Sequence, residues 1–209
     1  MQMTIWEQSW YLRGMEELMP DMLCDEPIAH RIFDMVTERS VIRASSYAKA
    51  GADILFLGDD IGMQSSKMMS DELYLEWIWP RLKEVIDAAK AINPEIIVFY
   101  HSCGYALPFY EYLIRAGVDV LNPVQPECMD FRSVYEEFGG RVSFHGTIGT
   151  QTVMPFGTPD EIRSKVFENL KTAEKHGGLL VAPTHMIEPE VPWENILAYA
   201  DACHDYRQL

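Results

Sequence analysis

The segment His-Ser-Cys-Gly at residues 101–104 holds residue types that could bind a metal. It directly follows the apolar run 96–100. In an extended chain, side chains two residues apart point to the same side, so His101 and Cys103 could both face one ion. Zinc accepts imidazole nitrogen and thiolate sulfur, and a catalytic zinc site combines three protein ligands with one open position. The pair predicts two zinc ligands, with an ordinary polar strand end as the alternative.

A third ligand is expected at the end of another strand. His185, which follows the run Gly-Leu-Leu-Val-Ala-Pro-Thr, is the best placed, and His145 after Val-Ser-Phe is second. A bound zinc would hold Cys103 as a thiolate and could activate a thiol, a water or an ether oxygen. The remaining cysteines lie in helical or loop segments, so we interpret them as structural: Cys24, Cys128 and Cys203.

Two adjacent carboxylates, Asp59 and Asp60, come directly after another apolar run. Either could act as a general acid or base, or could position a cationic group of a substrate. The alternative is a loop turn or a cap for the following segment. The sequence predicts a catalytic role for at least one of them.

Other polar residues also fall at predicted strand ends, where α/β barrels and open sheets gather their chemistry. Glu7 follows the first predicted strand, Asn122 and Gln125 lie at or just after the end of the fourth, and His145 lies at the end of the fifth. We expect these four side chains to line the substrate pocket. Polar residues are also common wherever a strand meets solvent, so each of them alone is a weak signal.

Short apolar runs alternate with helical patterns along the chain. Strands are predicted at 3–6, 52–58, 95–101, 118–123, 141–146 and 178–183, and helices at 25–51, 70–92, 158–178 and 192–206. Ser70 and Thr158 are expected to cap helices, and Pro80 to bend one. The alternation predicts a single α/β domain over 1–209, a parallel (β/α)₈ barrel that lacks its first one or two units. An open sheet is the alternative.

Length and composition narrow the class of protein. The 209 residues suffice for one domain with a core, and the net charge of −15 argues against nucleic-acid binding. No apolar run approaches the ~20 residues that span a bilayer, and no signal-peptide pattern is present. The four cysteines form no Cys-x-x-Cys pair and show no secretory context, so a disulfide framework is not expected. We therefore expect a cytoplasmic protein without membrane contact.

Two long segments resemble a known family. Residues 51–90, GADILFLGDDIGMQSSKMMSDELYLEWIWPRLKEVIDAAK, are similar to the middle of the uroporphyrinogen decarboxylase superfamily. Residues 177–202, GGLLVAPTHMIEPEVPWENILAYADA, are similar to its closing segment. The resemblance covers nearly the whole chain and places Asp59, or Asp60, at the position of an essential aspartate of the decarboxylases.

The resemblance favours the methyltransferase branch of that superfamily, which uses zinc held by a His-x-Cys pair and a later cysteine. His101 and Cys103 match that pair, and Pro-Thr-His185 stands in place of Pro-Gly-Cys. This implies zinc, methyl exchange between a small thiol, amine or ether substrate and cobalamin on a partner corrinoid protein, and a homodimer.

The sequence leaves two alternatives open. The first is metal-free decarboxylation of a porphyrinogen in porphyrin biosynthesis, in which Asp59 would bind the pyrrole nitrogens. The Arg-rich N-terminal motif of that branch is absent from this chain, and Arg13, Arg43 and Arg115 are poorly placed to replace it. The second is a non-enzymatic remnant or a fragment, whose exposed strand edges would favour association.

Overall fold

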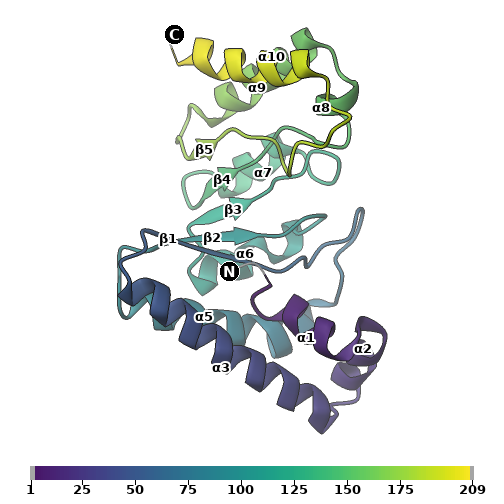
Figure 1. The fold of residues 1–209 in the computed structure, drawn as a ribbon, viewed down its shortest axis with the longest axis vertical. Helices are drawn as coiled ribbons and strands as arrows, with labels where there is room; N and C mark the ends of the chain where they lie inside the picture. Colours follow the sequence, from purple (N-terminus) through teal and green to yellow (C-terminus); the bar gives the residue numbers. More distant parts are fainter. Residues whose placement is uncertain (1–2, 208–209) are drawn as a thin grey trace. The chain divides into compact units, whose positions relative to one another are not determined.

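The computed structural model describes residues 3–207 and divides into two compact units, residues 1–120 and 121–209. Within each unit, short parallel strands are joined by helices, which makes both of them α/β structures (Figure 1). The prediction that the chain forms a single domain stays a prediction.

The strands of the first unit are β1, Ile54–Gly58, and β2, Ile97–His101. They pair in parallel, and the last pair in the register joins Gly58 to His101. Alternate residues are fully buried, as in Leu55 and Leu57 of β1. The two strands therefore end together, and the loops that follow them start from one edge. β3, Val120–Asn122, crosses the boundary between the units.

Helices α3 and α5 of the first unit pack against each other and run side by side in Figure 1. Pro80 lies in the first turn of α5, after a π-helical segment that ends at Ile78, and the predicted bend at Pro80 stays a prediction. Ser70 accepts a hydrogen bond from the Leu73 N–H, which confirms the predicted cap. The helical segments are α1 Trp6–Arg13, α2 Met15–Leu23, α3 Pro27–Lys49, α4 Asp71–Leu73, η1 Tyr74–Ile78, α5 Trp79–Lys90, η2 Leu107–Phe109 and α6 Tyr110–Ala116.

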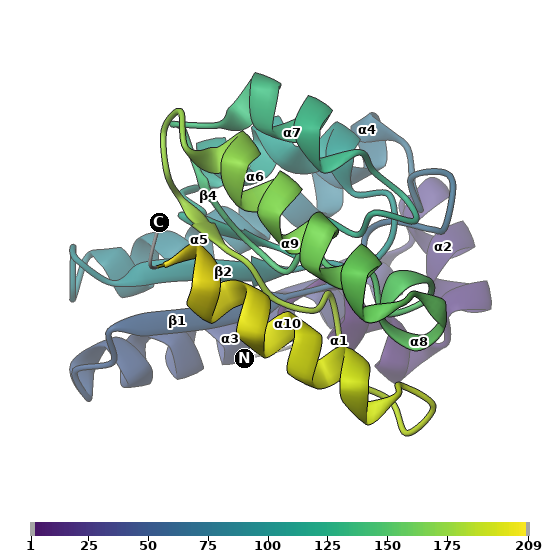
Figure 2. The ribbon, with the colours of Figure 1, turned by 90° about the horizontal axis from the view of Figure 1, so that it is seen from above.

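The second unit pairs β4, Ser143–His145, in parallel with β5, Leu179–Leu180. Its core lies around α9 and α10, which pack side by side (Figure 2). Thr158 and Glu161 form a full capping box at the start of α9, as the sequence predicts for Thr158. The helices are α7 Phe131–Phe138, α8 Val153–Phe156, α9 Pro159–Ala173 and α10 Trp193–Tyr206.

The predicted strand at 3–6 is wrong. Of the described residues in that range, Met3 has a φ of 58° and Trp6 already begins α1. The N–H of Thr4 donates to Gly58 and to the carboxylate of Asp59. The apolar pattern Thr-Ile-Trp is equally suited to a buried helix start, and the carboxylate of Asp59 decides between the two by accepting the N–H groups of that start.

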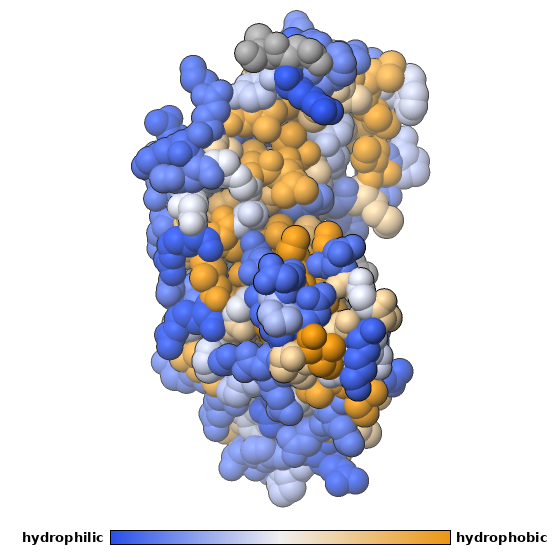
Figure 3. All heavy atoms as spheres, turned by 90° about the vertical axis from the view of Figure 1, so that its left-hand side faces the viewer, coloured by the Kyte–Doolittle hydropathy of each residue, from blue (hydrophilic) through white to orange (hydrophobic). Residues whose placement is uncertain are grey.

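One face of the second unit carries apolar surface, visible as orange spheres in the upper part of Figure 3. The exposed large apolar side chains of this unit are Phe156, Leu180, Met186, Ile187, Trp193 and Leu197. Among residues 3–207, no helix combines the length and the apolar character that a membrane crossing requires.

Candidate functional site

His101 and Cys103 lie close together at the end of β2. The Nε2 atom of His101 is 3.4 Å from the Sγ atom of Cys103, and both residues are half-buried. The rings of Phe56 and Phe99 stack with their centroids 4.8 Å apart, and Phe56 also stacks with the imidazole of His101. The two potential ligands therefore share a side of the strand end, next to an aromatic surface.

The turn that carries Cys103 is held by close backbone packing. Gly104 has a φ of +77°, and a side chain there would place its Cβ 2.6 Å from the carbonyl oxygen of Gly62. The N–H of Tyr105 donates to the carbonyl of Met63 at 2.7 Å. Only glycine fits both the left-handed backbone and this approach, so the turn is well defined.

Asp60 reaches the same strand end. Its Oδ1 atom accepts a 2.8 Å hydrogen bond from the backbone N–H of Cys103 and lies 3.7 Å from Nε2 of His101. The carboxylate is half-exposed. It thus holds the backbone of one candidate ligand and lies beside the ring of the other, as carboxylates around protein metal sites commonly do.

Asp59 has a different role from its neighbour. Its side chain is fully buried and accepts the N–H groups of Thr4, Ile5 and Glu7 at 2.9 to 3.0 Å. Burial raises the pKa of Asp59 to about 7, while the hydrogen bonds from Glu7 and Ile5 act to lower it. Asp59 therefore caps the start of α1, an earlier segment of the chain, and not the segment that follows it, as the alternative to a catalytic role had expected. Its burial argues against contact with a ligand, and a catalytic role for Asp59 stays a prediction.

Glu7 lies in the first turn of α1 and is half-buried. Burial raises the pKa of its carboxyl group, and the nearby charge of Asp60 raises it further. Acidic groups thus gather near the candidate ligand pair of the first unit, as expected for a site that accepts a cation.

In the second unit, Asn122 and His145 contact each other directly. The Nδ2 atom of Asn122 is 2.8 Å from Nδ1 of His145 and 3.1 Å from its carbonyl oxygen. Burial lowers the pKa of His145. Gln125, also predicted to bind substrate, is buried, and its carbonyl accepts the N–H groups of Cys128 and Met129 in the loop after β3.

His185 lies on the exposed segment after β5. The residue before it is fixed, because Thr184 is buried and its hydroxyl lies 3.1 Å from the hydroxyl of Thr150. The N–H of Thr184 also donates to the carbonyl of Ile148. Sequence reasoning missed this support, although the polar segment Thr-Ile-Gly-Thr after β4 contains two of its residues.

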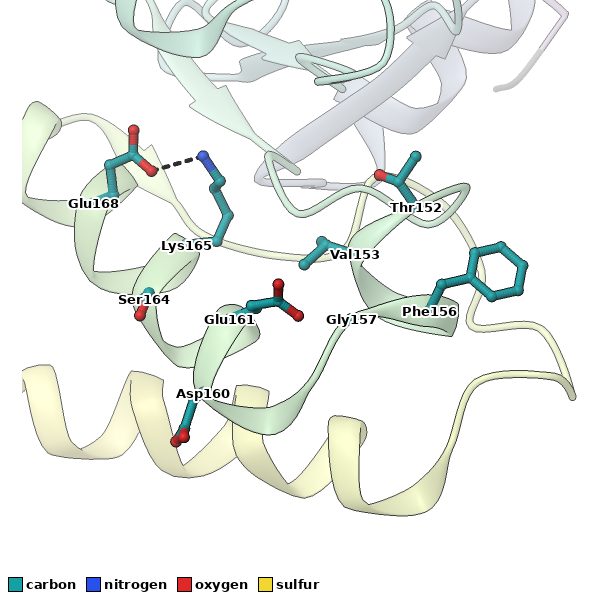
Figure 4. Close-up of a pocket in the computed structure, with 9 residues that line it drawn as sticks. All are labelled: Thr152, Val153, Phe156, Gly157, Asp160, Glu161, Ser164, Lys165 and Glu168. Atoms are coloured by element: carbon teal, nitrogen blue, oxygen red, sulfur yellow. Dashed lines mark hydrogen bonds and ion pairs between the residues drawn. The ribbon is translucent and has the colours of Figure 1, made fainter.

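A separate groove of about 680 Å³ lies between α8 and the first turns of α9 (Figure 4). Val153 and the exposed Phe156 supply its apolar wall, and Lys165 pairs with Glu168 at 2.6 Å on its rim. It contains none of the predicted site residues, and its side chains suggest no specific chemistry.

The donor set of the first unit fits zinc. An imidazole nitrogen and a thiol sulfur lie 3.4 Å apart, and a carboxylate accepts a hydrogen bond from the backbone of Cys103. Zinc binds this mixture of nitrogen and sulfur, whereas calcium and magnesium prefer oxygen ligands. Each of the four cysteines is free of disulfide bonds, so Cys103 keeps its thiol.

Comparisons with known proteins cover both units. A family described as "Uroporphyrinogen decarboxylase (URO-D)" matches residues 5–206. The chain is 27% identical over 201 residues to a methylated-thiol–coenzyme M methyltransferase of Methanosarcina mazei, covering 93% of this chain and 49% of that protein. It is 25% identical to a methylcobamide:CoM methyltransferase of Methanosarcina barkeri, covering 83% and 48%.

A uroporphyrinogen decarboxylase of Christiangramia forsetii is 24% identical, over 86% of this chain and 49% of that protein. The solved structure of a methyltransferase from Methanosarcina mazei superposes with a TM-score of 0.77 at 22% identity, over 95% of this chain and 56% of that one. The comparison confirms the α/β barrel-type fold in partial form. The chain spans about half the length of the curated relatives it matches.

Proposed function

Because the chain belongs to the uroporphyrinogen decarboxylase family, we propose that it acts in zinc-dependent methyl transfer between a small thiol, amine or ether and a corrinoid protein. Zinc, when bound, would lower the pKa of a coordinated thiol or make an ether oxygen a better leaving group. Two of the similar proteins, both from Methanosarcina, are named as methyltransferases of coenzyme M. Proteins named as decarboxylases match as well. An observation on this chain itself must therefore distinguish methyl transfer from decarboxylation.

That observation is the His-x-Cys pair. His101 and Cys103 bring a nitrogen and a sulfur within 3.4 Å of each other at a strand end. Metal-free decarboxylation needs no such pair, whereas thiol activation by zinc needs soft ligands on a rigid element. The backbone of Cys103 is further held by Asp60.

We propose His185 as the third ligand. His101, Cys103 and His185 each offer one ligand atom, two imidazole nitrogens and one sulfur, and a fourth position would remain for the substrate. His185 follows β5, and its neighbour Thr184 is anchored to the loop after β4. Asp60 and Glu7 would contribute negative charge that favours a cationic metal centre.

The experiment is zinc analysis of purified protein, beside Cys103→Ser and the matched variant Cys128→Ser. We expect about one zinc per chain in the wild type and in Cys128→Ser. Cys128 is a suitable control because burial raises the pKa of its thiol, which disfavours the thiolate that binds zinc. Cys103→Ser should lose the metal. With cobalt(II) in place of zinc, a thiolate-to-cobalt absorption band should disappear in Cys103→Ser alone. Zinc-free wild type, or unchanged zinc in Cys103→Ser, would reject the proposal.

Decarboxylation of a porphyrinogen is the weaker alternative. It would require Asp59 to bind pyrrole nitrogens, but that carboxylate is buried and already accepts three backbone N–H groups. Turnover of uroporphyrinogen by the zinc-free protein would reverse this ranking. No turnover with normal folding would remove the alternative.

A further inference from the structure

His145 and Asn122 form a contact whose proton positions follow from the geometry. The Nδ2 atom of Asn122 lies 3.1 Å from the backbone oxygen of His145, which can only accept a hydrogen bond. This carbonyl fixes which way the amide of Asn122 points, because the reverse orientation would set two oxygens against each other. The amide nitrogen must therefore face His145.

The same amide nitrogen lies 2.8 Å from Nδ1 of the imidazole. An amide NH₂ group donates and has no acceptor, so Nδ1 must accept. An imidazole that accepts at Nδ1 is neutral and carries its single proton on Nε2. Partial burial of the ring, which lowers the pKa of His145, agrees with the neutral form.

Backbone packing keeps Asn122 in place. Gly146 has a φ of +78°, and a Cβ there would come within 3.0 Å of Nδ2 of Asn122. The carbonyl of Gly146 also accepts the N–H of Val124, which ties the end of β4 to the loop after β3. The contact between Asn122 and His145 thus belongs to the strand ends and is not a chance surface contact.

We infer that Asn122 holds His145 as the neutral Nε2–H tautomer, so that His145 binds an oxygen or sulfur acceptor of the substrate as a hydrogen-bond donor and does not bind zinc. A metal would need the lone pair of Nε2, which is protonated in this tautomer, and Nδ1 is engaged by Asn122. In this assignment Asn122 is a positioning residue and His145 a substrate-binding residue.

The inference decides between the two histidines that the sequence offers as third ligand, in favour of His185. Its substrate-binding half rests on the proposed function, whereas the tautomer does not. The two can therefore be tested separately.

The test is long-range ¹H–¹⁵N correlation spectroscopy of the ¹⁵N-labelled chain, which distinguishes protonated from unprotonated ring nitrogens. The signals of His145 are assigned by their loss in His145→Gln. In the wild type we expect a protonated Nε2 and an unprotonated Nδ1. Asn122→Ala should give a mixture of tautomers, and Asn122→Asp should move the proton to Nδ1, because a carboxylate accepts.

Asn93→Ala is the matched control, since that amide donates to the carbonyl of Ala52 in the first unit and should leave the signals of His145 unchanged. Adding one equivalent of zinc to the wild type should also leave His145 as the Nε2–H tautomer. A proton on Nδ1 in the wild type, or a zinc-induced loss of the Nε2 proton, would overturn the inference even if zinc binds elsewhere in the chain.

The donor role is tested by KM in methyl transfer. His145→Phe should raise KM about tenfold with little change in kcat. His145→Gln keeps an N–H donor, so its KM should stay close to that of the wild type. Equal effects of the two variants would refute substrate binding. If no methyl transfer is found at all, the proposed function fails, and the spectra still decide the tautomer.

Discussion

The strand ends of the two units carry polar side chains of different kinds. In the first unit they are ionisable: Asp59, Asp60, His101 and Cys103 lie directly after β1 or at the end of β2. In the second unit most are neutral and engaged with one another. Asn122 donates to His145, and the hydroxyl of Thr184 lies against that of Thr150. The first set can hold a cation, whereas the second can orient neutral donors.

Within the first unit, two adjacent aspartates show the same contrast at closer range. Asp59 is fully buried and caps α1, while Asp60 is half-exposed and holds Cys103. Identical side chains one residue apart thus serve stability in one case and the candidate site in the other. Residue type alone does not distinguish them, but burial and partners do.

The largest expected effect separates these aspartates by stability. Asp59→Leu leaves the N–H groups of Thr4, Ile5 and Glu7 without their acceptor. The free energy of unfolding should therefore fall by more than about 3 kcal/mol. The matched variant Asp60→Leu should cost about 1 kcal/mol, since it removes one partly exposed hydrogen bond. Urea unfolding measures both. Equal losses of unfolding free energy in the two variants would show that the buried carboxylate of Asp59 contributes no more to stability than that of Asp60.

The next effect concerns zinc affinity and the histidines of the second unit. His185→Ala should weaken zinc binding by more than about 100-fold. Removing a metal ligand lowers the affinity more than removing a residue that hydrogen-bonds to a ligand, which costs about 10- to 100-fold. His176→Ala is the control, as that ring packs against Tyr135. Competition with a chromophoric chelator gives both affinities. An unchanged affinity in His185→Ala would place the third ligand elsewhere.

A smaller effect is expected from the carboxylate beside the ligand pair. Asp60→Asn keeps an oxygen acceptor for the Cys103 N–H but removes the charge 3.7 Å from His101. Zinc affinity should fall about tenfold, as is usual for partners of metal ligands. The same competition assay applies. A change below twofold would show that Asp60 acts only through the backbone of Cys103.

The smallest effect tests stability within the second unit, away from its site residues. Thr158→Ala removes the capping box of α9 and should cost about 1 kcal/mol. Thr172→Ala in the same helix should be nearly neutral, because its hydroxyl only bonds back to the carbonyl of Glu168. Thermal unfolding of the two variants compares them directly. Zinc affinity should be unchanged in both.

Local signals in the sequence predicted much of the fold. Prolines, caps and apolar runs placed α3, α5, α9 and five of the six predicted strands within a few residues of their positions. The prediction failed at 3–6, because the start of α1 is determined by the carboxylate of Asp59, which lies more than fifty residues away in the chain. No local pattern carries that information.

The sequence by itself predicted that His101 and Cys103 share one side of a strand end, since side chains two residues apart in an extended chain point the same way. It also determined that acidic and soft ligand types follow the apolar runs. Only the tertiary structure decided which aspartate is buried, how Asn122 meets His145, and that Gly104 must pass close to Gly62. These depend on contacts between segments far apart in the chain, where burial and hydrogen-bond geometry set the role of each side chain.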